Sequence, residues 1–131
     1  MIYDAMNGVA GPFAEAVFRG RLGAGEDSVI LRRCDPLPDF GGHHPDPNLV
    51  YCRDLAVDFG VVPRSDDDPA PMDPPPQFGA AADGDADRNM IVGAGRFVTP
   101  SDSVAIIAHY AKVGIVVWLR LRACCCCCCC W

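Results

Sequence analysis

Residues 78–93 read FGAAADGDADRNMIVG, and this stretch decides the fold because an acidic turn separates two apolar runs. The turn, residues 83–88, carries Asp83, Asp85 and Asp87 at alternate positions and ends with Arg88. Side chains two positions apart share one face of an extended chain, whereas on a helix they fan out around the axis. The apolar runs 78–82 and 89–93 are typical of buried strands. The sequence therefore predicts a strand, an acidic loop and a second strand.

Converging carboxylates need a counter-ion, since each like-charge pair in contact costs roughly 4 kcal/mol at an effective dielectric of about 20. Hard divalent cations such as magnesium, calcium and manganese prefer oxygen ligands. A solvated acidic turn is the alternative, but such a turn needs no apolar strand on either side. An EF-hand calcium loop is excluded, because it requires glycine and glutamate where this chain has Arg88 and Ala94.

Length and charge narrow the class of protein. The chain has 131 residues and a formal net charge of -6. This length suits one domain with its own core, and the negative charge argues against a nucleic-acid partner. His109, Lys112 and Arg120 interrupt the apolar stretch 104–121, so no membrane-spanning helix is expected. The start of the chain lacks a secretory signal pattern, which favours a cytoplasmic location and leaves a plastid location open. The sequence does not indicate the oligomeric state.

The cysteines do not form a metal-binding or disulfide pattern. Seven of the nine form the unbroken run Cys124–Cys130, and adjacent cysteines cannot all pair in good geometry or supply tetrahedral ligand spacing. We interpret residues 114–131 as a low-complexity or out-of-frame tail. Cys34 and Cys52 are expected to be ordinary thiols in a reducing compartment.

Residues 1–60 are expected to form the first part of an α/β domain, with strands at 2–6 and 28–33. A glycine-flanked turn at 7–11 joins the first strand to a helix that opens at Pro12 and ends at Gly23. The predicted apolar stripe of this helix consists of Phe13, Ala16, Val17 and Leu22. The turn could cradle a phosphate at the helix N-terminus, but a P-loop lysine is absent and a tight turn is preferred.

A second helix is predicted after the turn-rich segment 39–48, capped by Asp46, opened by Pro47 and stopped by Gly60. Its predicted apolar stripe consists of Leu49, Cys52, Leu55 or Ala56, and Phe59. His43 and His44 invite a metal interpretation. Neighbours in an extended chain point to opposite faces, so only one of the two could join a site, and we favour a role in anchoring the loop.

The remainder falls into two parts. Residues 61–77, rich in proline, are expected to be a disordered surface insertion, and the triplet Asp66–Asp68 within it is a weaker metal candidate than residues 83–88. Residues 78–113 are expected to supply the metal-loop strands, a hairpin across the three residues 93–95, and a helix opened by Thr99 and Asp102. The predicted buried stripe of that helix consists of Val104, Ile107, Ala108 and Ala111. The expected fold class is therefore α/β.

Four segments carry a family resemblance: YDAMNGVAGPF at 3–13, DFGGHHPDPNL at 39–49, FGAAADGDADRNMIVG at 78–93 and FVTPSDSVAIIA at 97–108. In this order they resemble the second domain of the alpha-D-phosphohexomutase superfamily, and they look closest to phosphoglucomutases of the eukaryotic type. The resemblance covers most of residues 2–109. It implies one domain of a phosphohexomutase, with a small mixed sheet and flanking helices.

The same resemblance implies a magnesium-dependent isomerase of carbohydrate metabolism. By this resemblance Asp83, Asp85 and Asp87 hold Mg²⁺, and Arg88 lies beside the reacting phosphate. In the family, a phosphoserine on another domain donates its phosphoryl group to a hexose phosphate. Glucose 1,6-bisphosphate then forms as the intermediate between glucose 1-phosphate and glucose 6-phosphate. Such transfer relies on positioning and on cations that absorb charge.

The chain departs from the family pattern in several places. Ala86 stands where many members have glycine, and alanine is expected to restrict the backbone there to negative φ while the loop survives. The sequence contains no serine loop of the TASHNPGG kind, no sugar-selecting loop of the GEESFG kind and no C-terminal phosphate-binding domain. This chain alone is therefore expected to lack mutase turnover. A truncated, inactive product and a stand-alone metal- or phosphate-binding module are the alternatives.

Overall fold

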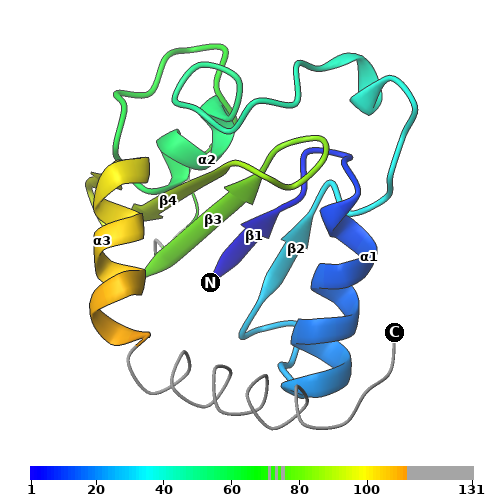
Figure 1. Ribbon diagram of the computed structural model, residues 1–131. Helices are drawn as coiled ribbons and strands as arrows, with labels where there is room; N and C mark the ends of the chain where they lie inside the picture. Colours follow the sequence, from blue (N-terminus) through cyan, green and yellow to red (C-terminus); the bar gives the residue numbers. More distant parts are fainter. Residues whose placement is uncertain (71, 73, 75, 112–131) are drawn as a thin grey trace, which may run out of the picture. The chain divides into compact units, whose positions relative to one another are not determined.

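The computed structural model describes residues 1–70, 72, 74 and 76–111, so the poly-Cys tail lies outside the described residues. The chain divides into two units, residues 1–100 and 101–131. Figure 1 follows the elements in chain order. They are β1 (Ile2–Asp4), α1 (Ala10–Ala14) with its π-helical continuation η1 (Glu15–Arg21), β2 (Ile30–Arg32), the short 3₁₀ turn η2 (Phe40–Gly42), α2 (Arg53–Asp58), β3 (Phe78–Ala82), β4 (Asn89–Gly93), β5 (Arg96–Val98) and α3 (Pro100–Tyr110).

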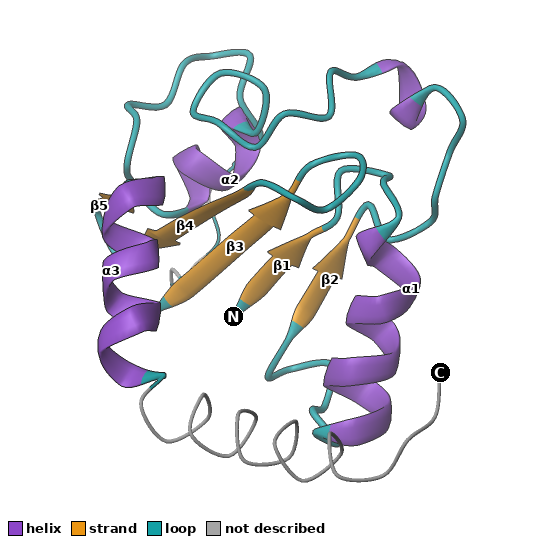
Figure 2. Ribbon diagram, in the orientation of Figure 1, coloured by secondary structure: helices purple, strands orange, loops and turns teal. Residues whose placement is uncertain are grey.

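The strands form a mixed sheet in the order β2-β1-β3-β4-β5, five strands among the described residues. Strand β1 pairs in parallel with both β2 and β3, whereas β4 is antiparallel to β3 and to β5. The three parallel strands therefore end at one edge of the sheet, where Figure 2 shows the connecting loops gathered. Ligand sites of α/β sheets lie outside such carboxyl ends.

Helix α2 packs on one face of the sheet. The core of this face joins Leu55 of α2 and the flanking Cys52 and Phe59 to Ile2, Ala81, Met90 and Val92 of the strands and to Met6. The buried residues of β4 alternate, as expected for a strand with one face in the core. The predicted stripe of the second helix is therefore confirmed at Cys52, Leu55 and Phe59.

Helix α1 packs on the opposite face of the sheet. Successive side chains of a strand point to opposite faces, so Tyr3 of β1 lies on the face away from Ile2 and Asp4. Ala10 of α1 belongs to a core cluster with Ala5 and Ala82, next to Tyr3. The ring of Tyr3 also contacts Phe18 of η1, with ring centroids 5.6 Å apart.

The predicted apolar stripe of the first helix is wrong. Phe13, Val17 and Leu22 are exposed, and the buried residues of α1 are Ala10, Gly11 and Ala14. A methyl group on Gly11 would lie 1.8 Å from the carbonyl oxygen of Cys34. Only small side chains allow this close approach, so the small face turns inward and the bulky face outward. Pro12 is the third residue of the helix, not the first.

The second helix begins later than predicted, at Arg53. The side-chain oxygen of Asn48 accepts hydrogen bonds from the backbone N–H groups of Val50 (2.8 Å) and Tyr51 (2.9 Å), which fixes a turn in place of the first helical turn. The predicted capping role of Asp46 is also wrong, because its carboxylate accepts from Arg88 and Asn48.

The hairpin between β4 and β5 is tighter than predicted. Gly93 pairs directly with Arg96, so the loop consists of Ala94 and Gly95 alone. Gly95, the second residue of this turn, has a φ of 65°, a conformation that favours glycine at that place. The local pattern located the turn, but only the strand register fixes its length.

Helix α3 was predicted correctly, but its buried stripe was not: Val104 and Ile107 are 65% and 62% exposed. A single helix cannot bury its own apolar face, so the periodicity alone does not determine burial. Among the described residues, no helix is long and apolar enough to cross a membrane.

Candidate metal centre

The acidic loop, residues 83–88, directly follows β3 at the carboxyl edge of the parallel strands. Asp83 is 1% exposed, whereas Asp85 and Asp87 are exposed to solvent. Each contributes a carboxylate oxygen, and these oxygens all lie within 4.8 Å of one another. The structure therefore brings together the three aspartates that the sequence singles out.

Asp83 is the fixed member of the group. Its Oδ1 accepts a hydrogen bond from the backbone N–H of Arg88 (3.0 Å), and its Oδ2 accepts one from Nε of the same residue (2.8 Å). Burial opposes the charged form, but these hydrogen bonds outweigh it and hold the pKa of Asp83 below its usual value. Asp83 is thus an anchored anion at the floor of the loop.

The pKa of Asp87 reflects repulsion among the three carboxylates. The negative charges of Asp85 and, next, Asp83 raise the pKa of Asp87 above its usual value. A cation among the three carboxylates would relieve this repulsion. Three hard oxygen donors within 4.8 Å of one another, one buried and two exposed, fit a hard divalent cation such as Mg²⁺, which usually keeps some water or phosphate ligands.

The guanidinium of Arg88 contacts Asp83 and Asp46 and remains exposed to solvent. Its Nε donates to Asp83, and its Nη1 lies 3.1 Å from Oδ1 of Asp46 in the loop before α2. The hydrogen bond with Asp83 and then the charge of Asp46 raise the pKa of Arg88. The side chain is nevertheless 62% exposed, so it can contact an anion that approaches the carboxylates.

Two neighbouring segments hold the acidic loop at Gly84. The N–H of Val9 donates to the carbonyl of Gly84 (3.0 Å), and the N–H of Gly84 donates to the carbonyl of Pro45 (3.2 Å). A methyl group on Gly84 would lie 2.8 Å from the ring of Phe40, and one on Gly8 would lie 2.7 Å from the oxygen of Gly84. Sequence reasoning did not assign Gly8, Phe40 or Pro45 to the site. The motifs at 3–13 and 39–49 were the available signal.

Ala86 lies at the tip of the loop with a φ of 65°. The expectation that alanine restricts this position to negative φ is therefore wrong: the loop imposes the left-handed conformation and alanine adopts it at an energetic cost. The loop itself survives the substitution, as expected.

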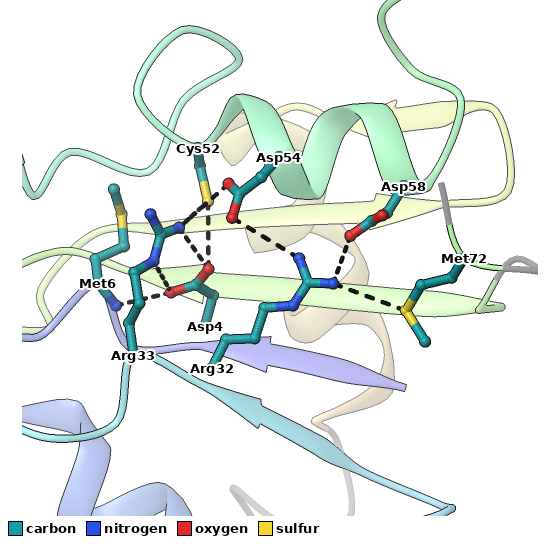
Figure 3. Close-up of polar contacts among 8 residues, drawn as sticks. All are labelled: Asp4, Met6, Arg32, Arg33, Cys52, Asp54, Asp58 and Met72. Carbon is teal, nitrogen blue, oxygen red and sulfur yellow. Dashed lines mark hydrogen bonds and ion pairs between the residues drawn. The ribbon is translucent and has the colours of Figure 1, made fainter. Parts of the chain in front are cut away.

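A second acidic group lies on the α2 face of the sheet. Ligand atoms of Asp4, Cys52 and Asp54 also lie within 4.8 Å of one another. Figure 3 shows the guanidinium of Arg33 between them, with contacts to Cys52 Sγ at 3.4 Å and Asp54 Oδ1 at 3.3 Å. Arg33 therefore contacts all three members of this group and compensates their charge. In the acidic loop, Arg88 pairs with Asp83 (2.8 Å) and Asp87 (3.7 Å), and no ion pair to Asp85 is found among the described residues. Burial is the main cause that raises the pKa of Cys52, to about 12, so the thiol stays protonated.

The weaker metal candidates have other contacts. The ring of His44 stacks on Tyr51, with centroids 4.4 Å apart, as expected for a residue that anchors its loop. Asp68 of the acidic triplet accepts hydrogen bonds from Arg53 Nε (2.8 Å) and Ser65. The extent of the predicted disordered insertion stays a prediction.

Comparisons with known proteins place the chain among sugar-phosphate mutases. Residues 1–95 match the family described as "Phosphoglucomutase/phosphomannomutase, alpha/beta/alpha domain II". The chain is 53% identical over 113 residues to a phosphoglucomutase of Rhizobium radiobacter, and 55% identical over 113 residues to a cytoplasmic phosphoglucomutase of Mesembryanthemum crystallinum. Both alignments cover 86% of this chain and 18% of the relative.

A solved structure agrees in fold. The open form of the Paramecium phosphoprotein parafusin, a phosphoglucomutase, superposes with a TM-score of 0.71 at 51% identity. The alignment covers 86% of this chain and 18% of that chain. The present chain therefore spans about a fifth of the length of these relatives, over a region with the same α/β/α architecture.

Proposed function

Because the chain belongs to the phosphoglucomutase/phosphomannomutase family, as its second α/β/α domain, we propose that it supplies the Mg²⁺-binding loop of a phosphoglucomutase. The observation that supports this proposal is the convergence of three carboxylate oxygens within 4.8 Å on the loop after β3. The loop lies where parallel strands end, the usual place for a ligand site in this fold class.

Asp83, Asp85 and Asp87 would hold the cation. When bound, Mg²⁺ would offset negative charge on the oxygens of a phosphoryl group in transfer. Asp83 would fix the site through its hydrogen bonds to Arg88. Asp85 and Asp87 are exposed, so a phosphate could reach a cation held there. The exposed guanidinium of Arg88 would bind and orient that phosphate.

The substrate and the complete reaction are proposed from the family. The relatives are phosphoglucomutases, so the whole protein would interconvert glucose 1-phosphate and glucose 6-phosphate through glucose 1,6-bisphosphate, as an isomerase of sugar metabolism in the cytoplasm. The phosphoserine and the sugar-selecting loop have no counterpart in this sequence. Residues 1–131 by themselves would therefore bind the cation without mutase turnover.

A Mg²⁺ titration of the full chain, followed by NMR of backbone amides, tests the metal site. We expect shifts that cluster at residues 83–88, and an affinity that falls about tenfold or more in Asp85→Asn, as for loss of a group at a metal site. The matched control is Asp66→Asn, which removes the same charge from an exposed position of the Pro-rich segment.

Equal affinities of the wild type and Asp85→Asn would contradict the proposal. Tight binding of glucose 1,6-bisphosphate without Mg²⁺ would instead favour a stand-alone phosphate-binding module. Mutase turnover by the purified chain would contradict the expectation of inactivity.

A further inference from the structure

A buried ion pair connects the first strand to the segment after the second. Asp4 ends β1 and is 0% exposed. Arg33 directly follows β2 and grips this carboxylate with two donors, Nε to Oδ1 at 2.8 Å and Nη2 to Oδ2. This two-pronged geometry, visible in Figure 3, fixes the relative position of the two side chains in a way that a single hydrogen bond does not.

The same carboxylate holds the turn that leaves β1. Oδ1 of Asp4 also accepts a hydrogen bond from the backbone N–H of Met6 (2.9 Å). Met6 and Asn7 both have positive φ, 48° and 56°. Consecutive non-glycine residues in this region are costly and persist only where surrounding contacts impose them.

Arg33 holds the turn a second time through its backbone. Its carbonyl accepts a hydrogen bond from the N–H of Asn7 (2.8 Å), and its own φ of 46° is positive. The side chain of Asn7 donates to the carbonyl of Asp35 (2.8 Å). The conformation of residues 6–8 thus depends on the segment that Arg33 begins.

The turn at residues 6–9 packs directly against the acidic loop. Val9 donates to Gly84 at 3.0 Å, and Gly8 approaches the Gly84 backbone so closely that a methyl group would lie 2.7 Å from its oxygen. A shift of the turn by a few tenths of an ångström would therefore move Gly84, next to Asp83.

We propose that the Asp4–Arg33 ion pair is a positioning element for the metal loop, which it acts on through the turn at residues 6–9. The effect on Mg²⁺ binding rests on the proposed function. The effect of the ion pair on the positions of the turn and the loop does not depend on it. The pair does not touch the three metal-loop aspartates. Groups hydrogen-bonded directly to metal ligands typically change metal affinity about 10- to 100-fold when they are altered. The Asp4–Arg33 pair acts one step further away, so the lower end of that range is expected.

The neighbouring pair Arg32–Asp58 provides a matched control. Arg32 Nη2 lies 2.6 Å from Asp58 Oδ2, and Asp58 is 5% exposed. This pair links β2 to α2, as Figure 3 shows, and the side chains of Arg32 and Asp58 make no described contact with the turn at residues 6–9. Asp4→Asn and Asp58→Asn remove the same charge from similarly buried pairs, so both should lower the free energy of unfolding.

The first measurement needs no metal. Hydrogen exchange of the Val9 amide reports its bond to Gly84, and native-state conditions are adjusted so that wild type and variants have equal global stability. We expect exchange of Val9 in Asp4→Asn to be about fivefold faster or more, the effect of weakening one hydrogen bond, with no change in Asp58→Asn. Unchanged exchange in Asp4→Asn, or an equal increase in both variants, overturns the proposal.

The second measurement is the Mg²⁺ affinity of the same folded variants. We expect about a tenfold loss in Asp4→Asn and none in Asp58→Asn. If Asp4→Asn does not fold, Arg33→Lys replaces it, because lysine keeps the charge but cannot form the two-pronged grip. A wild type that fails to bind Mg²⁺ would contradict the proposed function, while the exchange of Val9 would still decide whether the ion pair positions the loop.

Discussion

Replacing Ala86 by glycine should stabilise the protein. Ala86 is exposed and has a φ of 65°, in the left-handed region that L-residues disfavour. The conformation costs alanine about 1–2 kcal/mol relative to the right-handed one. Glycine avoids this cost. An exposed methyl group at a loop tip loses little packing when it is removed.

Glycine also loses more backbone freedom on folding, which cancels about 0.4–1 kcal/mol of the gain. The net expectation for Ala86→Gly is a rise of about 1 kcal/mol in the free energy of unfolding. For a domain of this size, this corresponds to a rise in Tm of about 4 °C or more. Urea unfolding followed by circular dichroism, with calorimetry for Tm, measures both quantities.

The hairpin between β4 and β5 supplies matched controls. Gly95 has the same φ of 65°, and a methyl group there would have no described heavy atom within 4 Å. Gly95→Ala should therefore lower stability by about 1 kcal/mol through the backbone alone. Ala94→Gly makes the same chemical change as Ala86→Gly at a position without positive φ, and should be destabilising by a few tenths of a kcal/mol or more. If Ala86→Gly is no more stable than wild type, or behaves like Ala94→Gly, the assigned strain at Ala86 is refuted.

Two further predictions concern the contact of Gly8 with the acidic loop and the charge of Asp83. Gly8→Ala should cost about 1–3 kcal/mol of stability and weaken Mg²⁺ binding, because its methyl group would meet the Gly84 backbone at 2.7 Å; unaltered urea unfolding and Mg²⁺ affinity would argue against the close contact. The pKa of Asp83 is lowered in the folded state, so its contribution to stability is present above the unfolded pKa of about 4 and is lost as pH falls through the lower folded value. As the pH falls from 6, the free energy of unfolding measured with urea should decrease less steeply in Asp83→Asn than in wild type. The same pH dependence in both proteins would contradict the lowered pKa of Asp83.

Local patterns predicted the elements around the site well. Strand β4 and the acidic loop followed from the apolar run 89–93 and from the spacing of Asp83, Asp85 and Asp87, which need no long-range information. The stop of α2 at Gly60 also agrees, since Gly60 has a φ of 65°.

The errors share a physical cause. Helix periodicity was read from bulky residues, but the close approach of Gly11 to Cys34 turned the small face of α1 inward. Asp46 looked like a helix cap, but its carboxylate is used by Arg88, which is 42 positions away in sequence. In each case a contact between distant segments overrode a local preference.

The sequence by itself determined the acidic loop and the alternation of strands and helices, because spacing along the chain fixes which side chains share a face. The order of its four motifs carried the family resemblance. The tertiary structure decided what supports that loop: the parallel pairing of β1 with β3 brings Gly8 against Gly84, and the pairing of β1 with β2 brings Arg33 to Asp4. These contacts join residues 29 to 76 positions apart, and no spacing rule specifies them, since they arise only when the sheet register places the carboxyl ends of the strands side by side.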